Sequence, residues 1–258
     1  MILNLAEGQG KTKIAYSGAY TTKTITVNGS RYTLYTITGS GTLTVKGKDQ
    51  SGVGIWLCGG GDTTSTLYGG GGGYFTQNTS YTLGKGTYTI TVGAAEGRST
   101  ISKSGTAVLT AAGATNQNGG SGGGGEGYVD GPGGKTGGKG SGTSTRPFGD
   151  SVNFTSLPCA GGGGGSYSGF GGTSNGGTGG SNGANGGRSE NPSGSSASGG
   201  TGGATGGGRG RSENNTGSGN ASYYGGGGGG RYRTGGNQSI QGANGTGYQG
   251  VVFMRVPA

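Results

Sequence analysis

Hydrophobic and polar residues alternate along much of the first half of the chain. From residue 20 to residue 57, in stretches such as YTTKTITVNGSRYTLYTITGSGTLTVKG, Thr, Val, Ile and Tyr recur with a period of two. This period predicts half-buried β-strands. Asn28-Gly29 predicts a tight hairpin turn, and Gly39-Ser40-Gly41 predicts a second turn.

Four further stretches predict strands. GVGIWLCGGG, residues 52–61, has the pattern of a buried strand that runs straight into glycine. TSYTLGKGTYTITVGA, residues 79–94, predicts a hairpin around Gly84-Lys85-Gly86, and RSTISKSGTAVLTAAG, residues 98–113, predicts another. The final VVFMRVPA predicts a last strand, stopped by Pro257. The chain has no stretch with a helical period.

Between these strands the chain is dominated by glycine. The 258 residues include 76 Gly but only 32 Leu, Ile, Val and Phe together, a composition usual in disordered chains. Of these 32, 21 lie in residues 1–109 and four in the last eight residues. Glycine runs followed closely by an aromatic residue recur at 69–75, 122–128, 161–167 and 225–232. The sequence therefore predicts a β-rich front, a glycine-rich middle and a short apolar tail.

The glycine runs have two interpretations. A flexible linker is the first, because glycine loses more backbone entropy on ordering than any other residue. Three features favour an ordered structure instead: the regular aromatic residues, the β segments on both sides, and the large share of the chain involved. Glycine fits an extended left-handed helix with three residues per turn, and such helices can pack closely. Each backbone hydrogen bond contributes about 1 kcal/mol net, which does little more than offset the entropy cost of ordering the residues. The ends of the glycine segments therefore need a clamp, which the β front and tail would supply.

Charge and residue types exclude most catalytic chemistry. The net charge is +9 and the pI about 9.6, which favours anionic partners. The chain has no His, so Ser-His and Cys-His pairs and most zinc sites are excluded. GPGGKT (131–136) and GQGKT (8–12) lack the first glycine of a phosphate-binding loop. We therefore expect no enzyme activity, no cofactor and no metal. Cys58 and Cys159 form no metal motif. Each precedes a glycine run, which leaves a bond between them open, and free buried thiols are the favoured interpretation.

The sequence has neither the pattern of a membrane-spanning stretch nor that of a signal peptide. No apolar run approaches the ~20 residues that cross a bilayer, so membrane insertion is not expected. The start, MILNLAEGQGK, has no basic segment followed by a long apolar stretch, which argues against a signal peptide. Seven Asn-x-Ser/Thr sequons would suit an extracellular receptor domain, but matches of this kind arise by chance in such a composition.

Nucleic-acid binding and ice binding are two functions that a glycine-rich chain can also serve. Arg209, Arg211, Arg231 and Arg233 lie among Gly and Tyr, as in single-strand nucleic-acid binders, although true arrays repeat this pattern many times. An antifreeze-type glycine bundle would need loops of constant length. The tyrosines after the glycine runs are 54, 39 and 65 residues apart, so the loops are unequal.

The order of motifs resembles the glycine-rich domains of tailed-phage structural proteins. The shared pattern runs from YTLYTITGSGTLTV through LCGGG, GGGGGYF and LGKGTYTITVGA. It continues with TSTRPFGDSVNFTSLPCAGGGGGSY (143–167) and the ending GTGYQGVVFMRVPA, and it covers roughly residues 31–258. The resemblance implies a sandwich of polyglycine helices. It also implies a place in the virion, since the family includes fibre-tip adhesins whose loops touch the host receptor.

These observations combine into one expectation. The fold should be mostly β with a polyglycine II helix bundle and essentially no α-helix. Residues 1–20 would form an attachment segment, 21–113 the β-rich region, and 114–258 the glycine-rich sandwich with a closing strand at 250–256. The expected function is a receptor-binding tip of a tail or head fibre that binds a host-surface protein or glycan non-covalently. The alternative is a virion decoration or spacer protein.

Loops on a rigid scaffold commonly carry recognition, so the receptor-binding candidates are loop residues. They are Arg146, Phe148, Arg188, Glu190, Arg211, Asn214, Tyr223 and Tyr224. The tyrosines that follow glycine runs are assigned to packing: Tyr74, Tyr128, Tyr167 and Tyr232. Other virion proteins would bind through the N-terminal region, nucleic acid is disfavoured as a partner, and a homo-oligomer stays open.

Overall fold

A computed structural model describes residues 12–65, 69–115, 219–221, 224–230, 232–234, 237–241 and 244–258. The described residues form twelve β-strands and no helix, as the sequence predicts. The strands are β1 (Lys13–Tyr16), β2 (Tyr20–Val27), β3 (Ser30–Ile37), β4 (Gly41–Lys46), β5 (Gln50–Cys58), β6 (Phe75–Leu83), β7 (Gly86–Thr91), β8 (Ser99–Lys103), β9 (Thr106–Ala111), β10 (Tyr232–Thr234), β11 (Asn237–Gln241) and β12 (Val251–Pro257).

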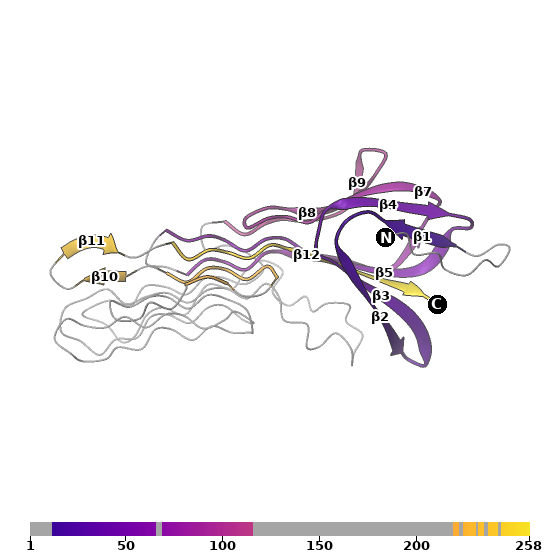
Figure 1. Ribbon diagram of the computed structural model, residues 1–258, viewed down its shortest axis with the longest axis horizontal. Helices are drawn as coiled ribbons and strands as arrows, with labels where there is room; N and C mark the ends of the chain where they lie inside the picture. Colours follow the sequence, from indigo (N-terminus) through magenta and orange to yellow (C-terminus); the bar gives the residue numbers. More distant parts are fainter. Residues whose placement is uncertain are drawn as a thin grey trace.

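Ten of these strands form two antiparallel sheets of five strands each. Sheet A has the order β1-β4-β7-β8-β9, and sheet B has the order β2-β3-β12-β5-β6. The strands β10 and β11 form a separate two-stranded sheet. Sheets A and B enclose a common core and are called the sandwich below (Figure 1).

The core of the sandwich follows from the alternation in the sequence. In β5, Ile55 and Leu57 belong to the core between the sheets, whereas Trp56 and Cys58 belong to a second apolar cluster with Phe253 of β12. Successive side chains of a strand point to opposite faces, so β5 and β12 are buried on both sides. Central strands of this kind hold the sandwich together.

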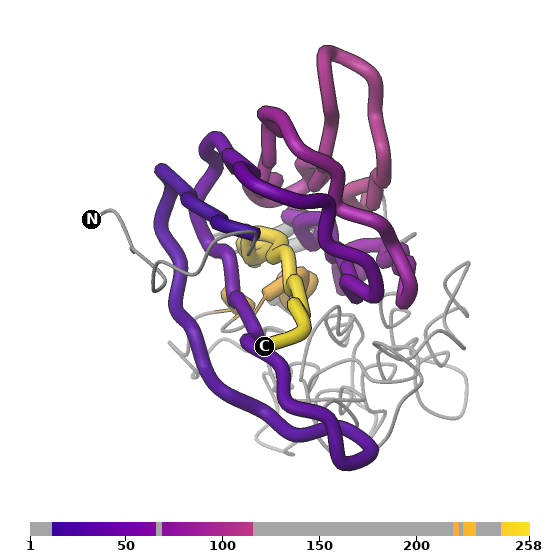
Figure 2. The backbone as a smooth tube through the Cα atoms, turned by 90° about the vertical axis from the view of Figure 1, so that its right-hand side faces the viewer, coloured from indigo at the N-terminus to yellow at the C-terminus, as the bar shows by residue number. Residues whose placement is uncertain are grey.

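The last strand completes the front of the molecule. β12 lies between β3 and β5, with Val252 opposite Ile37 on one side and Leu57 on the other. Figure 2 shows this yellow strand in the middle of the fold. β1 also belongs to the sandwich as the edge strand next to β4, although the sequence placed it in the expected attachment segment. Both ends of the described chain are thus built into the sandwich.

The turns test the sequence prediction in detail. Asn28 and Gly29 both have positive φ (48° and 79°) and join β2 to β3, which confirms the predicted hairpin. Ser104 and Gly105 do the same between β8 and β9. The predicted hairpin around Gly84-Lys85-Gly86 is wrong, because β6 lies in sheet B and β7 in sheet A. Alternation indicates which residues face the core, but it does not name the partner strand.

Where the strands end, glycine segments continue side by side along the long axis (Figure 1). The central one, residues 59–64, bonds to its neighbours with a period of three. Donors three residues apart on it reach the same neighbour, and in two of the three neighbours the acceptors are also three residues apart, in the opposite direction. In the third neighbour the acceptors are the Gly97 carbonyl and the Glu96 side chain. The pairs of donor and acceptor are Gly59 with Tyr74, Asp62 with Gly71, Gly61 with Tyr248, Thr64 with Gly245, Gly60 with Gly97, and Thr63 with the Glu96 carboxylate, at 2.8–3.0 Å.

A period of three is the repeat of an extended three-per-turn helix, whereas a strand has a period of two. The same period joins residues 69–74 to residues 225–230, where Gly70 donates to Gly228 and Gly73 donates to Gly225. We call this set of hydrogen-bonded segments, which also includes residues 93–97, 111–115 and 244–250, the glycine lattice. The polyglycine sandwich predicted for all of residues 114–258 stays a prediction, since most of that range lies outside the described residues.

The glycine lattice is packed backbone against backbone. A Cβ added to most of its glycines would overlap a carbonyl oxygen of a neighbouring segment, far inside the 3.0 Å that real Cβ atoms keep. The glycines with such a contact include Gly59, Gly60, Gly61, Gly73, Gly227, Gly228, Gly245 and Gly247. Only glycine allows segments to approach this closely, so its abundance is a packing requirement here.

A buried serine ties the lattice to the sandwich. The hydroxyl of Ser99, at the start of β8, donates to the carbonyl of Cys58 (2.7 Å) and accepts from the N–H of Gly93 (3.1 Å). Ser99 is fully buried. One side chain therefore fixes the point where β5 passes into the central glycine segment, which is the clamp that the lattice needs.

Candidate functional site

The molecule is elongated, and its two ends differ in kind. The sandwich lies at one end, the glycine lattice runs away from it, and the hairpin of β10 and β11 lies at the opposite end (Figure 1). β1 and β12, the first and last strands, are both in the sandwich. The β10–β11 end, called the distal end below, is therefore the part of the described chain farthest from the sandwich.

Most of the predicted receptor-binding residues lie outside the described part of the chain. These are Arg146, Phe148, Arg188, Glu190, Arg211, Asn214 and Tyr223. Their role stays a prediction. Of the tyrosines assigned to packing, Tyr128 and Tyr167 also lie outside, and Tyr232 is described only as a backbone position in β10. Tyr74 is half-buried at the end of a glycine run.

Tyr224 is the predicted candidate that the structure describes. It is half-buried and packs against the second apolar cluster, on the outer face of sheet B. Its ring meets the ring of Tyr248 edge-on, with centroids 6.0 Å apart. Among the described residues, Tyr248 is the large hydrophobic side chain left exposed, at 39%. Tyr224 therefore has a packing contact, and its part in binding stays a prediction.

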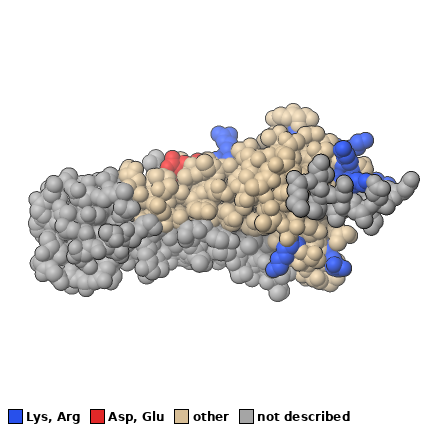
Figure 3. Space-filling model, viewed as in Figure 1, with Lys and Arg blue, Asp and Glu red and all other residues tan. Residues whose placement is uncertain are grey.

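The described lysines gather in one part of the molecule. Within the described ranges, the lattice segments contain Asp62 and Glu96 and no Lys or Arg. The sandwich contains all six described lysines (Figure 3). These six are Lys13, Lys23, Lys46, Lys48, Lys85 and Lys103. The sequence showed that lysines are confined to the first 139 residues, but not that the fold gathers them.

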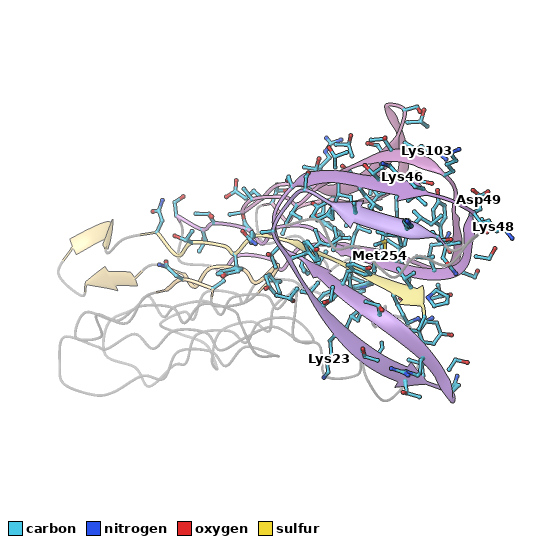
Figure 4. All side chains as sticks on the ribbon, turned by 45° about the vertical axis from the view of Figure 1, so that its right-hand side comes forward. Lys23, Lys46, Lys48, Asp49, Lys103 and Met254 are labelled. Carbon is cyan, nitrogen blue, oxygen red and sulfur yellow. The ribbon has the colours of Figure 1, made fainter. Side chains whose placement is uncertain are left out.

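Five of these lysines lie at the end of the sandwich that points away from the lattice. In sheet A, Lys13 is directly opposite Lys46. The paired register of β4 and β7 ends at Val45 and Gly86, and Lys85 lies in the bend directly before β7. Lys48 lies in the turn after β4, and Lys103 ends β8. Figure 4 shows Lys46, Lys48 and Lys103 together at this end, with Asp49 among them.

Local contacts order the turns that carry the lysines. The Asp49 carboxylate accepts the N–H of Lys85 at 2.7 Å, and the Thr12 hydroxyl donates to the carbonyl of Lys48 at 2.8 Å. The ammonium of Lys103 lies 5.0 Å from the ring centroid of buried Tyr88. Asp49 is the carboxylate side chain that the described turns contribute here. Among the described residues, this end thus carries five lysines and one carboxylate, that of Asp49.

The described residues show no group of three or more His, Cys, Asp or Glu side chains that could hold a metal ion. Cys58 is buried and free, with its thiol donating to the carbonyl of Gly59 at 3.3 Å. Cys159 lies outside the described residues. Within the same ranges, no helix is long and apolar enough to span a membrane.

Comparison of the chain with protein-family models, with curated proteins and with solved structures found no match. The likeness to phage glycine-rich domains therefore rests on the motifs in the sequence alone.

Proposed function

We propose that this protein is a virion structural protein of a tailed phage and forms the receptor-binding tip of a tail or head fibre. It binds a protein or glycan of the host surface non-covalently. The loops between the glycine runs make the contact, and the sandwich joins the protein to the rest of the fibre. Its place of action is the virion.

The observation that carries this proposal is that the two parts of the molecule are stabilised in different ways. The sandwich has a conventional apolar core, whereas the lattice is held by backbone bonds and depends little on side chains. The sequences of loops between the glycine runs can then change without disturbing the scaffold, which suits a surface that must follow changes in a receptor. The β10–β11 hairpin holds the end of such a scaffold far from the sandwich.

A decoration or spacer protein of the virion is the second candidate. The same elongated, side-chain-poor lattice would serve as a rigid spacer with no receptor at all. The two candidates differ in one property, which is affinity of the isolated protein for bacterial cells.

Cell binding by the labelled full-length protein tests the proposal. We expect the parent protein to bind a susceptible strain in a panel of bacteria. Replacing residues 209–216, or Ser222 and Tyr223, with Gly-Ser sequence should weaken binding by about tenfold or more, since Arg and Tyr often anchor interfaces. Tyr224 is kept in both variants because it packs against the second apolar cluster. The melting temperature should change little, because loop residues carry little of the fold.

A matched change on the sandwich controls for general effects. Ser104 and Thr106 are exposed in the β8–β9 hairpin, and replacing both with Ala should leave cell binding unchanged. If the parent binds no strain, or if the loop variants bind as well as the parent, the adhesin proposal fails and the spacer role takes its place.

A further inference from the structure

We propose that Asn28, in the turn between β2 and β3, is a site of spontaneous covalent modification, at which the asparagine is converted to aspartate and isoaspartate. The reaction needs no enzyme, and water is its co-reactant. The site lies in the sandwich, in the hairpin at one edge of sheet B. The proposal therefore goes beyond receptor binding and does not depend on it.

The backbone of the following residue supplies the nucleophile. The nitrogen of Gly29 attacks the side-chain amide carbon (Cγ) of Asn28, a new C–N bond forms, and ammonia leaves. The product is a cyclic succinimide. Water then opens the ring at either carbonyl carbon, which gives aspartate or, with the main chain routed through the side chain, isoaspartate. The sum is asparagine plus water to aspartate or isoaspartate plus ammonia. Glycine favours the attack because it has no Cβ to hinder the approach.

The turn leaves both reacting groups accessible. Asn28 and Gly29 have φ of 48° and 79°, the geometry of a tight hairpin turn, and the turn is closed by the pair Val27 and Ser30. Within the described part of the chain, the Gly29 N–H donates to no backbone carbonyl. Asn28 and Gly29 are both exposed, and a Cβ added to Gly29 would meet no atom within 4 Å. The attacking nitrogen is thus unshielded.

The reaction proceeds from a locally opened turn. In the folded turn the backbone at Asn28 is held in the left-handed conformation, and attack requires a rotation that brings the Gly29 nitrogen to Cγ. Opening is easy at this place, because the β2–β3 hairpin extends beyond the other strands of the sandwich and its tip is exposed (Figure 1). Exposed tips of this kind open at a small fraction of the free energy of global unfolding.

A second Asn-Gly pair in the described chain has the same chemistry in the opposite environment. Asn244 is exposed, but Gly245 is buried in the glycine lattice, and its N–H donates to the carbonyl of Thr64 at 3.1 Å. A Cβ added to Gly245 would overlap the carbonyl oxygen of Gly229. Attack by the Gly245 nitrogen therefore requires the lattice to open, which costs more than opening a hairpin turn. The fold, and not the sequence, distinguishes Asn28 from Asn244.

Isoaspartate at position 28 is expected to disturb the hairpin. It adds a main-chain atom to a tight turn whose two residues set the register of β2 against β3. Ile25 and Val27 of β2 are buried in the second apolar cluster, so a distorted turn weakens their packing. The modification should therefore lower the stability of the sandwich as the protein ages.

Peptide mapping by mass spectrometry tests the proposal on the full-length protein. Folded protein is incubated in mildly alkaline buffer below its melting temperature, and a parallel sample is incubated in concentrated urea. In the folded protein we expect Asn28 to be converted at least about tenfold faster than Asn244, which corresponds to about 1.4 kcal/mol of difference in opening free energy. In urea the two rates should agree within about twofold, because both asparagines precede an unhindered glycine. Methyl transfer by an isoaspartate methyltransferase distinguishes isoaspartate from aspartate.

Asn28→Gly is the matched control, because Gly-Gly also suits this turn and has no side-chain amide. After incubation, the melting temperature of the parent should fall further than that of the variant, in proportion to the conversion at Asn28. The proposal is overturned if Asn28 reacts no faster than Asn244 in the folded protein, or if its excess rate persists in urea. Equal losses of melting temperature in parent and variant would overturn the expected effect on the hairpin.

Discussion

Replacing Gly60 with Ala is expected to destabilise the folded protein by at least about 3 kcal/mol, as severe overpacking of a core does. The added methyl group would overlap the carbonyl oxygen and carbon of Ala94, which are backbone atoms with no rotamer to change. Gly60 also donates to Gly97, so a shift that relieves the clash would break a bond of the central segment. Thermal or urea unfolding followed by circular dichroism measures the loss.

Gly84→Ala is the matched control. Gly84 does not have a positive φ, and its added methyl group would meet the Lys103 ammonium at 3.1 Å, the end of a flexible side chain. The expected change is within about 1 kcal/mol, since an alanine also reduces the entropy of the unfolded chain. Equal melting temperatures for the two variants would mean that glycine is not used here for close backbone packing.

Replacing Trp56 with Ala is expected to cost about 3–5 kcal/mol, the usual range for deleting a buried aromatic side chain. Trp56 is fully buried, and its ring centroid lies 5.0 Å from that of Phe253 and 6.2 Å from that of Phe75. These residues join β5, β6 and β12 on the outer face of sheet B. The loss should appear in equilibrium unfolding as a lower midpoint with an unchanged slope.

Tyr248→Ala serves as the control for Trp56. Tyr248 is an aromatic residue at 39% exposure whose ring contacts Tyr224, and its removal should cost about 1 kcal/mol or less. If the Trp56 variant were as stable as the Tyr248 variant, the second apolar cluster would not contribute to the stability of the sandwich.

The alternation in the sequence predicted β2 to β9 and β12, but it did not predict β1, β10 or β11, nor which strands are partners. Ile55 and Leu57 face one side of β5 and Trp56 the other, as a period of two requires. Nothing local in GKG says that the chain leaves sheet B at Leu83 and enters sheet A at Gly86. The place of β12 between β3 and β5 is likewise a long-range pairing, which depends on the whole core.

For the glycine segments too, the sequence predicts the kind of packing but not which segments are partners. Their composition and their aromatic residues point to close backbone packing, and the hydrogen bonds of residues 59–64 have the three-residue period of such a structure. Which segment bonds to which depends on the clamp, including Ser99, and no sequence pattern predicts it. The pairing of Lys13 with Lys46 was missed because these residues come from separate strands, β1 and β4, and meet only through the register of sheet A.

Amide hydrogen exchange at the central glycine segment tests the central claim, which is that glycine builds an ordered lattice, most directly. The N–H groups of Gly59, Gly60 and Gly61 all donate to backbone carbonyls of other segments and are buried. We predict that they exchange as slowly as the amides of β5 and β12, because both open only when the clamp between lattice and sandwich opens. Exchange at random-coil rates in these glycines, while β5 stays protected, would contradict the lattice and restore the flexible-linker interpretation.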